Sequence, residues 1–201
     1  MIGIINYRCG NLQNIQNALD ALGHPSRLIS EPGEMQGVSK YILPGVGAFG
    51  HATANLHQFG FWEPLQQVFA QKIPMLGICV GMQLLFSKSD EDGEHLGLGL
   101  IPGEVVRFSH DLKVPHMGWN ELEIQAKDDP LFEGIGKSNW FYFVHSYACY
   151  PQDPQAVIGA AQYGHEFCAV VRRERLWGVQ FHPEKSQEDG MKLLDNFVRS
   201  C

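Results

Sequence analysis

The chain has 201 residues, of which 44% are hydrophobic and 18% charged, and its formal net charge is −7. This length and composition predict one globular domain with a substantial core. The negative balance and the lack of a lysine- or arginine-rich run argue against a nucleic-acid partner. No apolar run approaches the length of a membrane span, and the start of the chain reads as a strand rather than a signal peptide. Five cysteines without a CxxC pair favour a reducing compartment, so we expect a cytoplasmic protein.

Apolar strands alternate with helical patterns through the first half of the chain. Residues 2–5 read as a strand, and apolar residues at helical spacing from 12 to 22 then predict a helix that Gly23 ends. Further strands are predicted at 26–29, 41–43 and 73–78, with helical sequence around 61–70 and a helix from Val80 to about Ser87. This alternation predicts an α/β fold with a mostly parallel central sheet and helices on both faces.

The second half is richer in strands, which should add antiparallel strands to the sheet. They are predicted at 105–108, 122–124, 140–144, 157–162, 167–171 and 177–181. A final helix carries Met191, Leu194 and Phe197 on one side, with Ser186 as its expected N-cap. The acidic stretch 90–94 reads as a solvated loop.

Cys79 stands where a predicted strand meets a predicted helix, in the segment Gly77-Ile78-Cys79-Val80-Gly81. The two glycines allow a sharp turn and a close approach of the helix to its strand. A thiol at this corner lies at a helix N-terminus, where the macrodipole and a nearby imidazole favour the thiolate. The backbone N–H of Val80 points into the same space and is a candidate oxyanion donor. These features make Cys79 the candidate nucleophile.

A second motif, His182-Pro183-Glu184, follows the predicted strand 177–181. In extended chain His182 and Glu184 share a face, so the carboxylate can accept from one imidazole nitrogen while the other nitrogen faces the sulfur of Cys79. Nucleophile, base and orienting carboxylate are the groups that acyl transfer needs. Each motif alone has a structural alternative, a small core cysteine or a solvated His-x-Glu pair, but the two together favour catalysis.

The run Gly45–Gly50 matches the G-x-G-x-x-G pattern of dinucleotide sites. The next predicted strand, however, ends at Cys79 instead of at the acidic residue that such a site requires. We therefore expect no nucleotide cofactor, and we expect the N–H groups of this loop to complete an oxyanion hole. His110 and His116 are not spaced as a helical metal pair, so no metal is expected.

These motifs, in order along the whole chain, resemble class I (triad) glutamine amidotransferases. The cysteine and His-Pro-Glu segments are shared across that superfamily. Residues 115–120 (Pro-His-Met-Gly-Trp-Asn) and 144–147 (Val-His-Ser-Tyr) are similar to the glutaminase subunits of imidazole glycerol phosphate synthase in particular. The resemblance implies one type 1 glutamine amidotransferase domain over residues 1–201.

The resemblance also implies roles for individual residues. Cys79 would attack the glutamine side-chain amide to give a glutamyl thioester and ammonia, His182 would relay protons, and Glu184 would orient the imidazole. Backbone oxyanion donors are implied at Val46, Gly47 and Val80, and glutamine-binding positions at Gly47, Gln83, Ser146 and Tyr147. The residues implied to face a partner subunit are Asn11, Trp119, Tyr142 and Lys185. No cofactor is implied.

A glutaminase that fills the chain leaves no domain to use the ammonia. The resemblance therefore implies a heterodimer with a TIM-barrel cyclase subunit in histidine biosynthesis. Asn6 and Arg8 depart from the aspartate and glycine usual in this family, which leaves open a paralogous glutaminase that supplies ammonia for amidino-sugar synthesis. Two other classes stay open: a partner-independent cysteine hydrolase, fully active alone, and a non-catalytic binding module, which the intact triad and Gln83 disfavour.

Overall fold

A long mixed sheet organises the computed structural model, which describes residues 1–109, 111–136 and 139–201. Among these residues the strands run in the order β2-β1-β3-β4-β14-β13-β11-β7-β5-β6, with β12 and β9 joined beside β13. The strands of the parallel part are β1 (Ile2–Ile5), β2 (Ser26–Ile29), β3 (Lys40–Leu43), β4 (Met75–Ile78) and β14 (Leu176–Val179). His110, for which no metal role was expected, lies outside the described residues.

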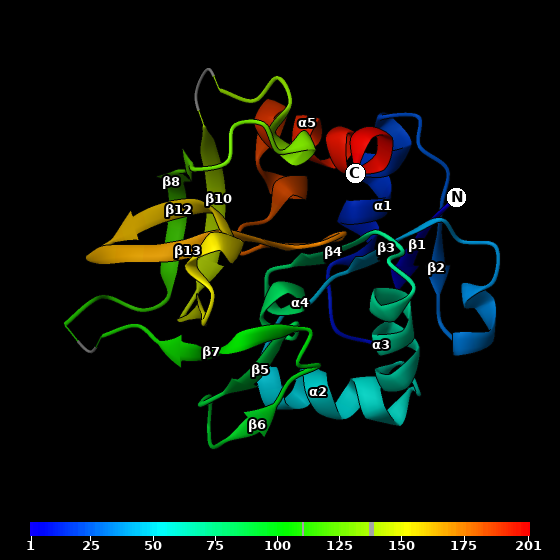
Figure 1. Ribbon diagram of the computed structural model, residues 1–201, viewed down its shortest axis with the longest axis horizontal. Helices are drawn as coiled ribbons and strands as arrows, with labels where there is room; N and C mark the ends of the chain where they lie inside the picture. The colour runs from blue at the N-terminus through cyan, green and yellow to red at the C-terminus, as the bar shows by residue number, and fades with distance from the viewer. Residues whose placement is uncertain (110, 137–138) are drawn as a thin grey trace.

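The remaining strands of this sheet are largely antiparallel, β5 and β7 being a parallel pair. They are β5 (Phe86–Ser89), β6 (His95–Leu96), β7 (Ile101–Arg107), β9 (Glu123–Ile124), β11 (Tyr147–Pro151), β12 (Val157–Tyr163) and β13 (His165–Arg173). A separate antiparallel pair, β8 (His116–Glu121) and β10 (Trp140–His145), stands beside them (Figure 1). The expected α/β fold with additional antiparallel strands is therefore confirmed.

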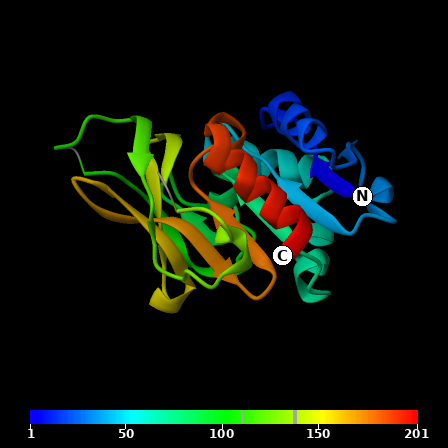
Figure 2. The ribbon, with the colours of Figure 1, turned by 90° about the horizontal axis from the view of Figure 1, so that it is seen from above.

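Helices cover both faces of the parallel part, as expected (Figures 1 and 2). On one face lie α1 (Leu12–Ala21) and α5 (Gln187–Ser200), and on the other α2 (Phe49–Gln58) and α3 (Trp62–Ala70). The short helical segments are α4 (Val80–Gln83), η1 (Pro32–Met35), η2 (Pro130–Phe132), η3 (Pro154–Ala156) and η4 (Pro183–Lys185). No helix in the described part of the chain is both long and apolar enough to cross a membrane.

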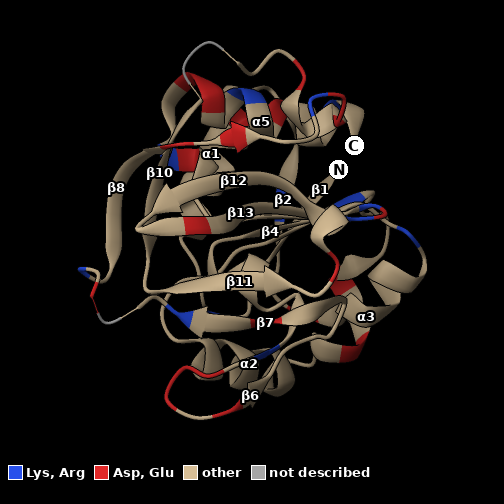
Figure 3. Cartoon of the chain, turned by 60° about the vertical axis from the view of Figure 1, so that its left-hand side comes forward, with Lys and Arg blue, Asp and Glu red and all other residues tan. Residues whose placement is uncertain are grey.

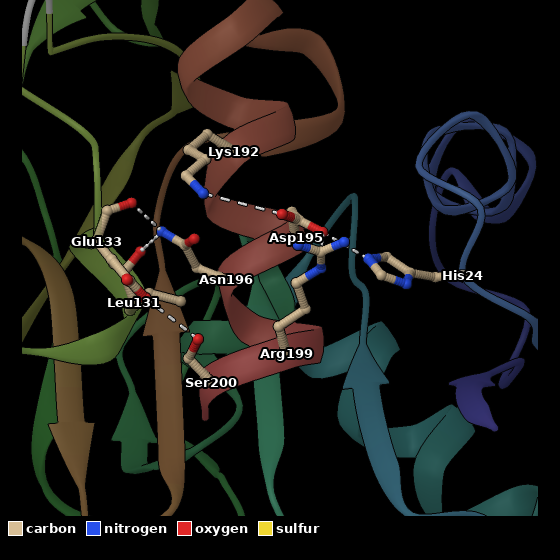
Figure 4. Close-up of polar contacts among 8 residues, drawn as sticks. All are labelled: His24, Leu131, Glu133, Lys192, Asp195, Asn196, Arg199 and Ser200. Atoms are coloured by element: carbon tan, nitrogen blue, oxygen red, sulfur yellow. Dashed lines mark hydrogen bonds and ion pairs between the residues drawn. The ribbon is translucent and has the colours of Figure 1, made fainter.

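Polar contacts fix α5 to segments that lie far away in the sequence (Figure 4). The Asp195 carboxylate lies 2.7 Å from Nε2 of His24, which follows α1, and 3.0 Å from Nε of Arg199. Asn196 is buried, and its amide donates to the carbonyl oxygens of Leu131 and Glu133. The amphipathic helix is thus held at its apolar face by the core and at its edges by hydrogen bonds.

One local expectation is wrong, and another is confirmed only in part. The helix expected from Val80 to Ser87 ends at Gln83, and β5 begins at Phe86, because the apolar residues that follow Gln83 enter the sheet. Ser186 stands at the N-cap of α5 as expected, but its side chain makes no capping hydrogen bond. Its hydroxyl instead donates to the carbonyl oxygen of His182 at 2.6 Å and accepts from the N–H of Tyr142 at 3.0 Å.

The acidic stretch 90–94 is only partly a solvated loop. It forms the acidic connection beside β6 in Figure 3. The side chain of Glu91, however, turns inward and accepts a hydrogen bond from the backbone N–H of Phe49 at 2.6 Å. An acidic group at the first residue of α2 satisfies a helix N–H that has no partner within the helix. The loop is therefore tied to α2.

Candidate active site

The cysteine corner is a strained turn between β4 and the single turn of α4. Cys79 has φ 55° and ψ −115°, a conformation that L-residues rarely adopt, and its N–H donates to the carbonyl oxygen of Val179 at 2.8 Å. Such strain persists only where the surrounding structure imposes it. A Cβ on Gly81 would overlap the carbonyl oxygen of Leu43, and one on Gly77 would lie 2.7 Å from the carbonyl oxygen of Gly81. Glycines at both positions thus let α4 sit against the sheet and hold the sulfur at its edge.

The expected dipole effect at this corner needs correction. Because α4 spans only Val80–Gln83, it lacks the length over which peptide dipoles sum into a macrodipole. What the corner retains is local: the N–H of Val80 belongs to the first turn, where helical N–H groups have no intrahelical partner. The electrostatic influence on the sulfur therefore comes chiefly from neighbouring side chains.

His182 supplies that influence from the end of β14. Its Nδ1 lies 2.9 Å from Oε1 of Glu184, and both side chains are almost fully buried. The backbone N–H of His182 donates to the carbonyl oxygen of Tyr142 at 2.9 Å, so β10 and the Ser186 hydroxyl hold the imidazole in place. The expected contact between His182 and Glu184 is present, but it forms across the 3-10 segment η4 and not along extended chain.

The imidazole of His182 is hydrogen-bonded to Glu184 and interacts with Cys79. Burial by itself lowers its pKa, but hydrogen bonds and charge attraction from Cys79 and Glu184 outweigh burial and raise the pKa from 6.5 to about 10. Since Nδ1 faces Glu184, the other ring nitrogen serves Cys79. At neutral pH this pKa favours an imidazolium at His182, next to the sulfur of Cys79 and hydrogen-bonded to Glu184. An imidazolium in this position favours the thiolate form from which a cysteine nucleophile attacks.

A cavity of about 300 Å³ opens over these groups. The positions predicted for oxyanion donation and glutamine binding all line it, as do Cys79 and His182: they are Val46, Gly47, Val80, Gln83, Ser146 and Tyr147. This volume lies at the lower end of the range found for small-molecule binding sites. The structure thus brings together these residues from four regions of the chain around one small cavity.

Glu91 and Gln180 were not predicted from the sequence to belong to this site. Glu91 lines the cavity, and burial raises the pKa of its carboxyl group. Gln180 is fully buried, accepts from the amide of Gln83 at 3.1 Å and places its own amide nitrogen 3.8 Å from Sγ of Cys79. A polar side chain in the apolar strand before His182 was the available signal for Gln180, whereas nothing distinguished Glu91 from its acidic neighbours.

Three of the four predicted partner-facing residues form one cluster. The rings of Trp119 and Tyr142 are 6.1 Å apart, and the Lys185 ammonium lies 5.9 Å from the centroid of the Tyr142 ring. Trp119 is 43% exposed, so its indole is available to another surface. Asn11, at the N-cap of α1, takes no part in these contacts.

The conformation of the loop after β1 explains how Asn6 and Arg8 replace the residues usual in the family. Arg8 has φ 63°, in the left-handed region where glycine is preferred, and its guanidinium lies 5.0 Å from the centroid of the Phe59 ring. Asn6 accepts from the N–H of Arg8 at 3.4 Å and donates to the Ser30 hydroxyl at 3.0 Å. The loop thus keeps a turn that suits glycine and compensates with side-chain contacts.

The fold and this arrangement of thiol, imidazole and carboxylate define a class of protein. The family model described as "Glutamine amidotransferase class-I" matches residues 4–201, and the chain belongs to this family. It is 50% identical over 197 residues to "Imidazole glycerol phosphate synthase subunit HisH" of Desulfitobacterium hafniense (strain Y51), which covers 98% of this chain and 93% of that protein. It is 49% identical to "Imidazole glycerol phosphate synthase subunit HisH 1" of Campylobacter jejuni subsp. jejuni (strain 81-176), covering 99% and 100% of the two chains.

Solved structures show the same fold at lower sequence identity. The chain superposes on a structure described as "Structure of PurLQS from Thermotoga maritima" with a TM-score of 0.80 at 18% identity, over 98% of this chain and 96% of that one. The fold is therefore shared with chains whose sequences have diverged widely.

Proposed function

We propose that this chain is the glutaminase subunit of an imidazole glycerol phosphate synthase, and that residues 1–201 form one glutamine amidotransferase domain. The relatives named for that subunit are about half identical to this chain along nearly its whole length, which supports the assignment. The observation that carries the chemistry is the His182 imidazole, which is hydrogen-bonded to Glu184 and interacts with Cys79 at the wall of a small cavity.

In the proposed reaction the Cys79 thiolate attacks the side-chain carbonyl carbon of glutamine. The C–N bond then breaks as the His182 imidazolium donates its proton to the leaving nitrogen, so ammonia departs and a glutamyl thioester is left on the sulfur. His182 next takes a proton from water, the hydroxyl attacks the thioester, and glutamate leaves as the thiolate reforms. Glu184 keeps the imidazole oriented through both steps.

The cavity walls supply the other functions that this reaction needs. The N–H groups of Val80 and of the Val46–Gly47 segment would stabilise the oxyanion of each tetrahedral intermediate. The Glu91 carboxylate offers a partner for the α-ammonium group of glutamine. Gly47, Gln83, Ser146 and Tyr147 would contact the remainder of the substrate.

The ammonia requires a second subunit, because it becomes ammonium in neutral water and ceases to be a nucleophile. We propose a heterodimer with a TIM-barrel cyclase that docks over Trp119, Tyr142, Lys185 and Asn11. The step of this chain is a hydrolysis, and the lyase step belongs to the partner. Five unpaired cysteines, all buried, agree with a cytoplasmic location.

Replacement of the nucleophile tests this assignment in the complex with the cyclase subunit from the same organism. Cys79→Ser should lower glutamine-dependent synthesis by at least about a thousandfold, the scale seen when a triad member is lost, and should spare synthesis from added ammonium. Cys201→Ser is the matched control, because Cys201 lies beside the start of β3, at the opposite end of the parallel strands.

The outcomes separate the alternatives. Equal loss of both activities in Cys79→Ser would contradict the division of labour. Full glutaminase activity without a cyclase would favour the partner-independent hydrolase, and none in any complex would favour the binding module. Activity only with the cyclase of a polysaccharide pathway would identify the amidino-sugar paralogue.

A further inference from the structure

Two buried histidines outside the triad lie directly opposite each other on β8 and β10. His116 and His145 are cross-strand partners, with Nδ1 of His116 3.0 Å from Nε2 of His145. They are only 5% and 6% exposed, and His145 also lines the cavity. Buried imidazoles with four specific hydrogen-bonding positions can adopt few tautomers, so their neighbours decide where each proton resides.

The cavity end of the pair sets the tautomer of His145. Its Nδ1 lies 2.8 Å from the backbone carbonyl oxygen of Tyr147, which can only accept, so Nδ1 carries the proton. In a neutral imidazole Nε2 must then be an acceptor. His116 therefore donates from its Nδ1, and its own Nε2 is left as an acceptor.

The amide of Asn120, on the other side of the histidine pair, independently requires His116 to accept at Nε2. Its Oδ1 accepts from the backbone N–H of Glu121 at 2.8 Å, and its Nδ2 donates to the carbonyl oxygen of Gln162 at 2.8 Å. These two bonds fix which side of the amide faces inward. The group that reaches Nε2 of His116, at 3.3 Å, is the donor Nδ2. The Tyr147 carbonyl and the Asn120 amide thus require the same proton positions on the two histidines.

The surroundings keep both imidazoles neutral. The ring of His116 is stacked between Tyr163, at 4.2 Å between centroids, and Phe143, at 5.1 Å. Burial lowers the pKa of His116 to about 4 and that of His145 to about 3, and the nearby positive charge of His182 acts on His145 in the same direction. A proton on either ring would place a second cation close to the catalytic imidazolium.

We propose that Asn120, His116 and His145 are positioning residues that form a one-directional hydrogen-bond chain, which holds the Tyr147 carbonyl in the glutamine pocket. That carbonyl oxygen also accepts from Nε2 of Gln83 at 3.3 Å, so the chain orients two pocket groups together. These hydrogen bonds begin beside Trp119 on β8 and end at Tyr147, which lines the cavity. The inference rests on the proposed function for its substrate, whereas the proton positions follow from the contacts alone.

Asn120→Asp tests this hydrogen-bond chain, because it replaces the Nδ2 donor that faces Nε2 of His116 with an acceptor in a side chain of the same shape. ¹⁵N NMR of histidine-labelled full-length chain should show His116 and His145 neutral at pH 7 in the parent, each protonated on Nδ1. In Asn120→Asp at least one of them should become charged or change tautomer, because His116 Nε2 would face a carboxylate. Glu121→Gln, a change in an exposed side chain on the same strand, should leave both signals unchanged.

Kinetics in the complex with the cyclase give the functional readout. For Asn120→Asp we expect KM for glutamine to rise about three- to tenfold, the scale of one neutral hydrogen bond, with kcat much less affected. Asn120→Ala, which introduces no charge, should raise KM as well. The rate of iodoacetamide alkylation of Cys79 should be unchanged in Asn120→Ala, since this variant introduces no charge near the triad.

Two results would overturn the inference. One is a parent protein in which either histidine is charged or protonated on Nε2 at pH 7, and the other is an unchanged KM in both Asn120 variants. A complex without any glutaminase activity would instead contradict the proposed function, and the NMR result would still decide whether the chain of hydrogen bonds exists.

Discussion

At the scale of single residues, the site depends on two unfavourable states that the structure holds in place. Cys79 keeps a left-handed backbone conformation, and His182 keeps a positive charge while almost fully buried. Each would relax if its neighbours were removed, the first by a change of φ and the second by loss of a proton. The close packing around Gly77 and Gly81 prevents the change of φ, and the contacts of His182 with Glu184 and Cys79 prevent the loss of its proton.

Glu184→Gln should therefore lower the pKa of His182, because the amide removes the negative charge beside Nδ1. The folded-state pKa of about 10 lies above the ordinary 6.5, so the stabilisation from these contacts is complete below about pH 6.5 and is lost as pH rises through about 10. An NMR titration of the His182 ring measures the midpoint. Glu174→Gln, at a half-exposed carboxylate paired with Lys72, is the control and should leave it in place. An identical midpoint in Glu184→Gln would contradict this account of the charge.

At the scale of elements, the position of α4 depends on the absence of side chains where it meets the sheet. Gly81 approaches Leu43 at the end of β3, and a Cβ on Gly178 of β14 would lie 2.7 Å from the side chain of Met82. Backbone that approaches backbone so closely leaves no room for a methyl group. The single turn after Cys79 thus packs closely against β3 and β14, and its position determines where the sulfur lies.

Gly81→Ala should displace α4 and both destabilise the fold and disable the nucleophile. We expect a loss of about 3 kcal/mol or more in the free energy of unfolding, since the overlap is with a backbone carbonyl that cannot rotate away. Urea unfolding followed by fluorescence gives the midpoint. Gly33→Ala, where a Cβ would meet no atom within 4 Å, should be nearly neutral. Equal midpoints for the two variants would show that the structure around Gly81 can accommodate a Cβ, contrary to the contacts seen here.

At the scale of the whole molecule, one buried carboxylate joins the parallel and antiparallel parts. Asp129 accepts from Arg172 of β13 at 2.6 Å, from the indole N–H of Trp177 of β14 at 3.2 Å and from the N–H of Leu131 at 2.9 Å. The η2 segment that it caps also receives the amide of Asn196 from α5. Hydrogen bonds around Asp129 and η2 therefore connect β13, β14 and α5.

Asp129→Ala should cost about 3 kcal/mol in the free energy of unfolding, because it leaves a buried indole N–H and a partly buried guanidinium without their acceptor. Denaturant unfolding at neutral pH measures the change. Lys88→Ala, which removes an exposed ion pair with Glu94, should change stability by less than about 1 kcal/mol. Similar losses in both variants would mean that Asp129 is no more than a surface contact.

Most strands were predictable because their apolar runs are short and bounded by turn residues. The strands at 2–5 and 26–29 have the predicted bounds. The helix predicted to Ser87 failed because Leu84-Leu85-Phe86 is apolar on every side, and periodicity cannot separate a buried helix from a buried strand. The strand β8 was not predicted, since its sequence His-Met-Gly-Trp-Asn-Glu lacks the β-branched residues that mark strands.

Local features could be read from a few neighbouring residues: the Cys79 corner between a strand and a helical turn, and the contact between His182 and Glu184. That contact was predicted for extended chain, but it forms across the 3-10 segment η4. Three other features could be seen only in the folded chain: Glu91 lines the cavity, Gln180 reaches the sulfur, and His116 lies opposite His145. The register between distant strands sets these contacts, and register follows from the packing of the whole core.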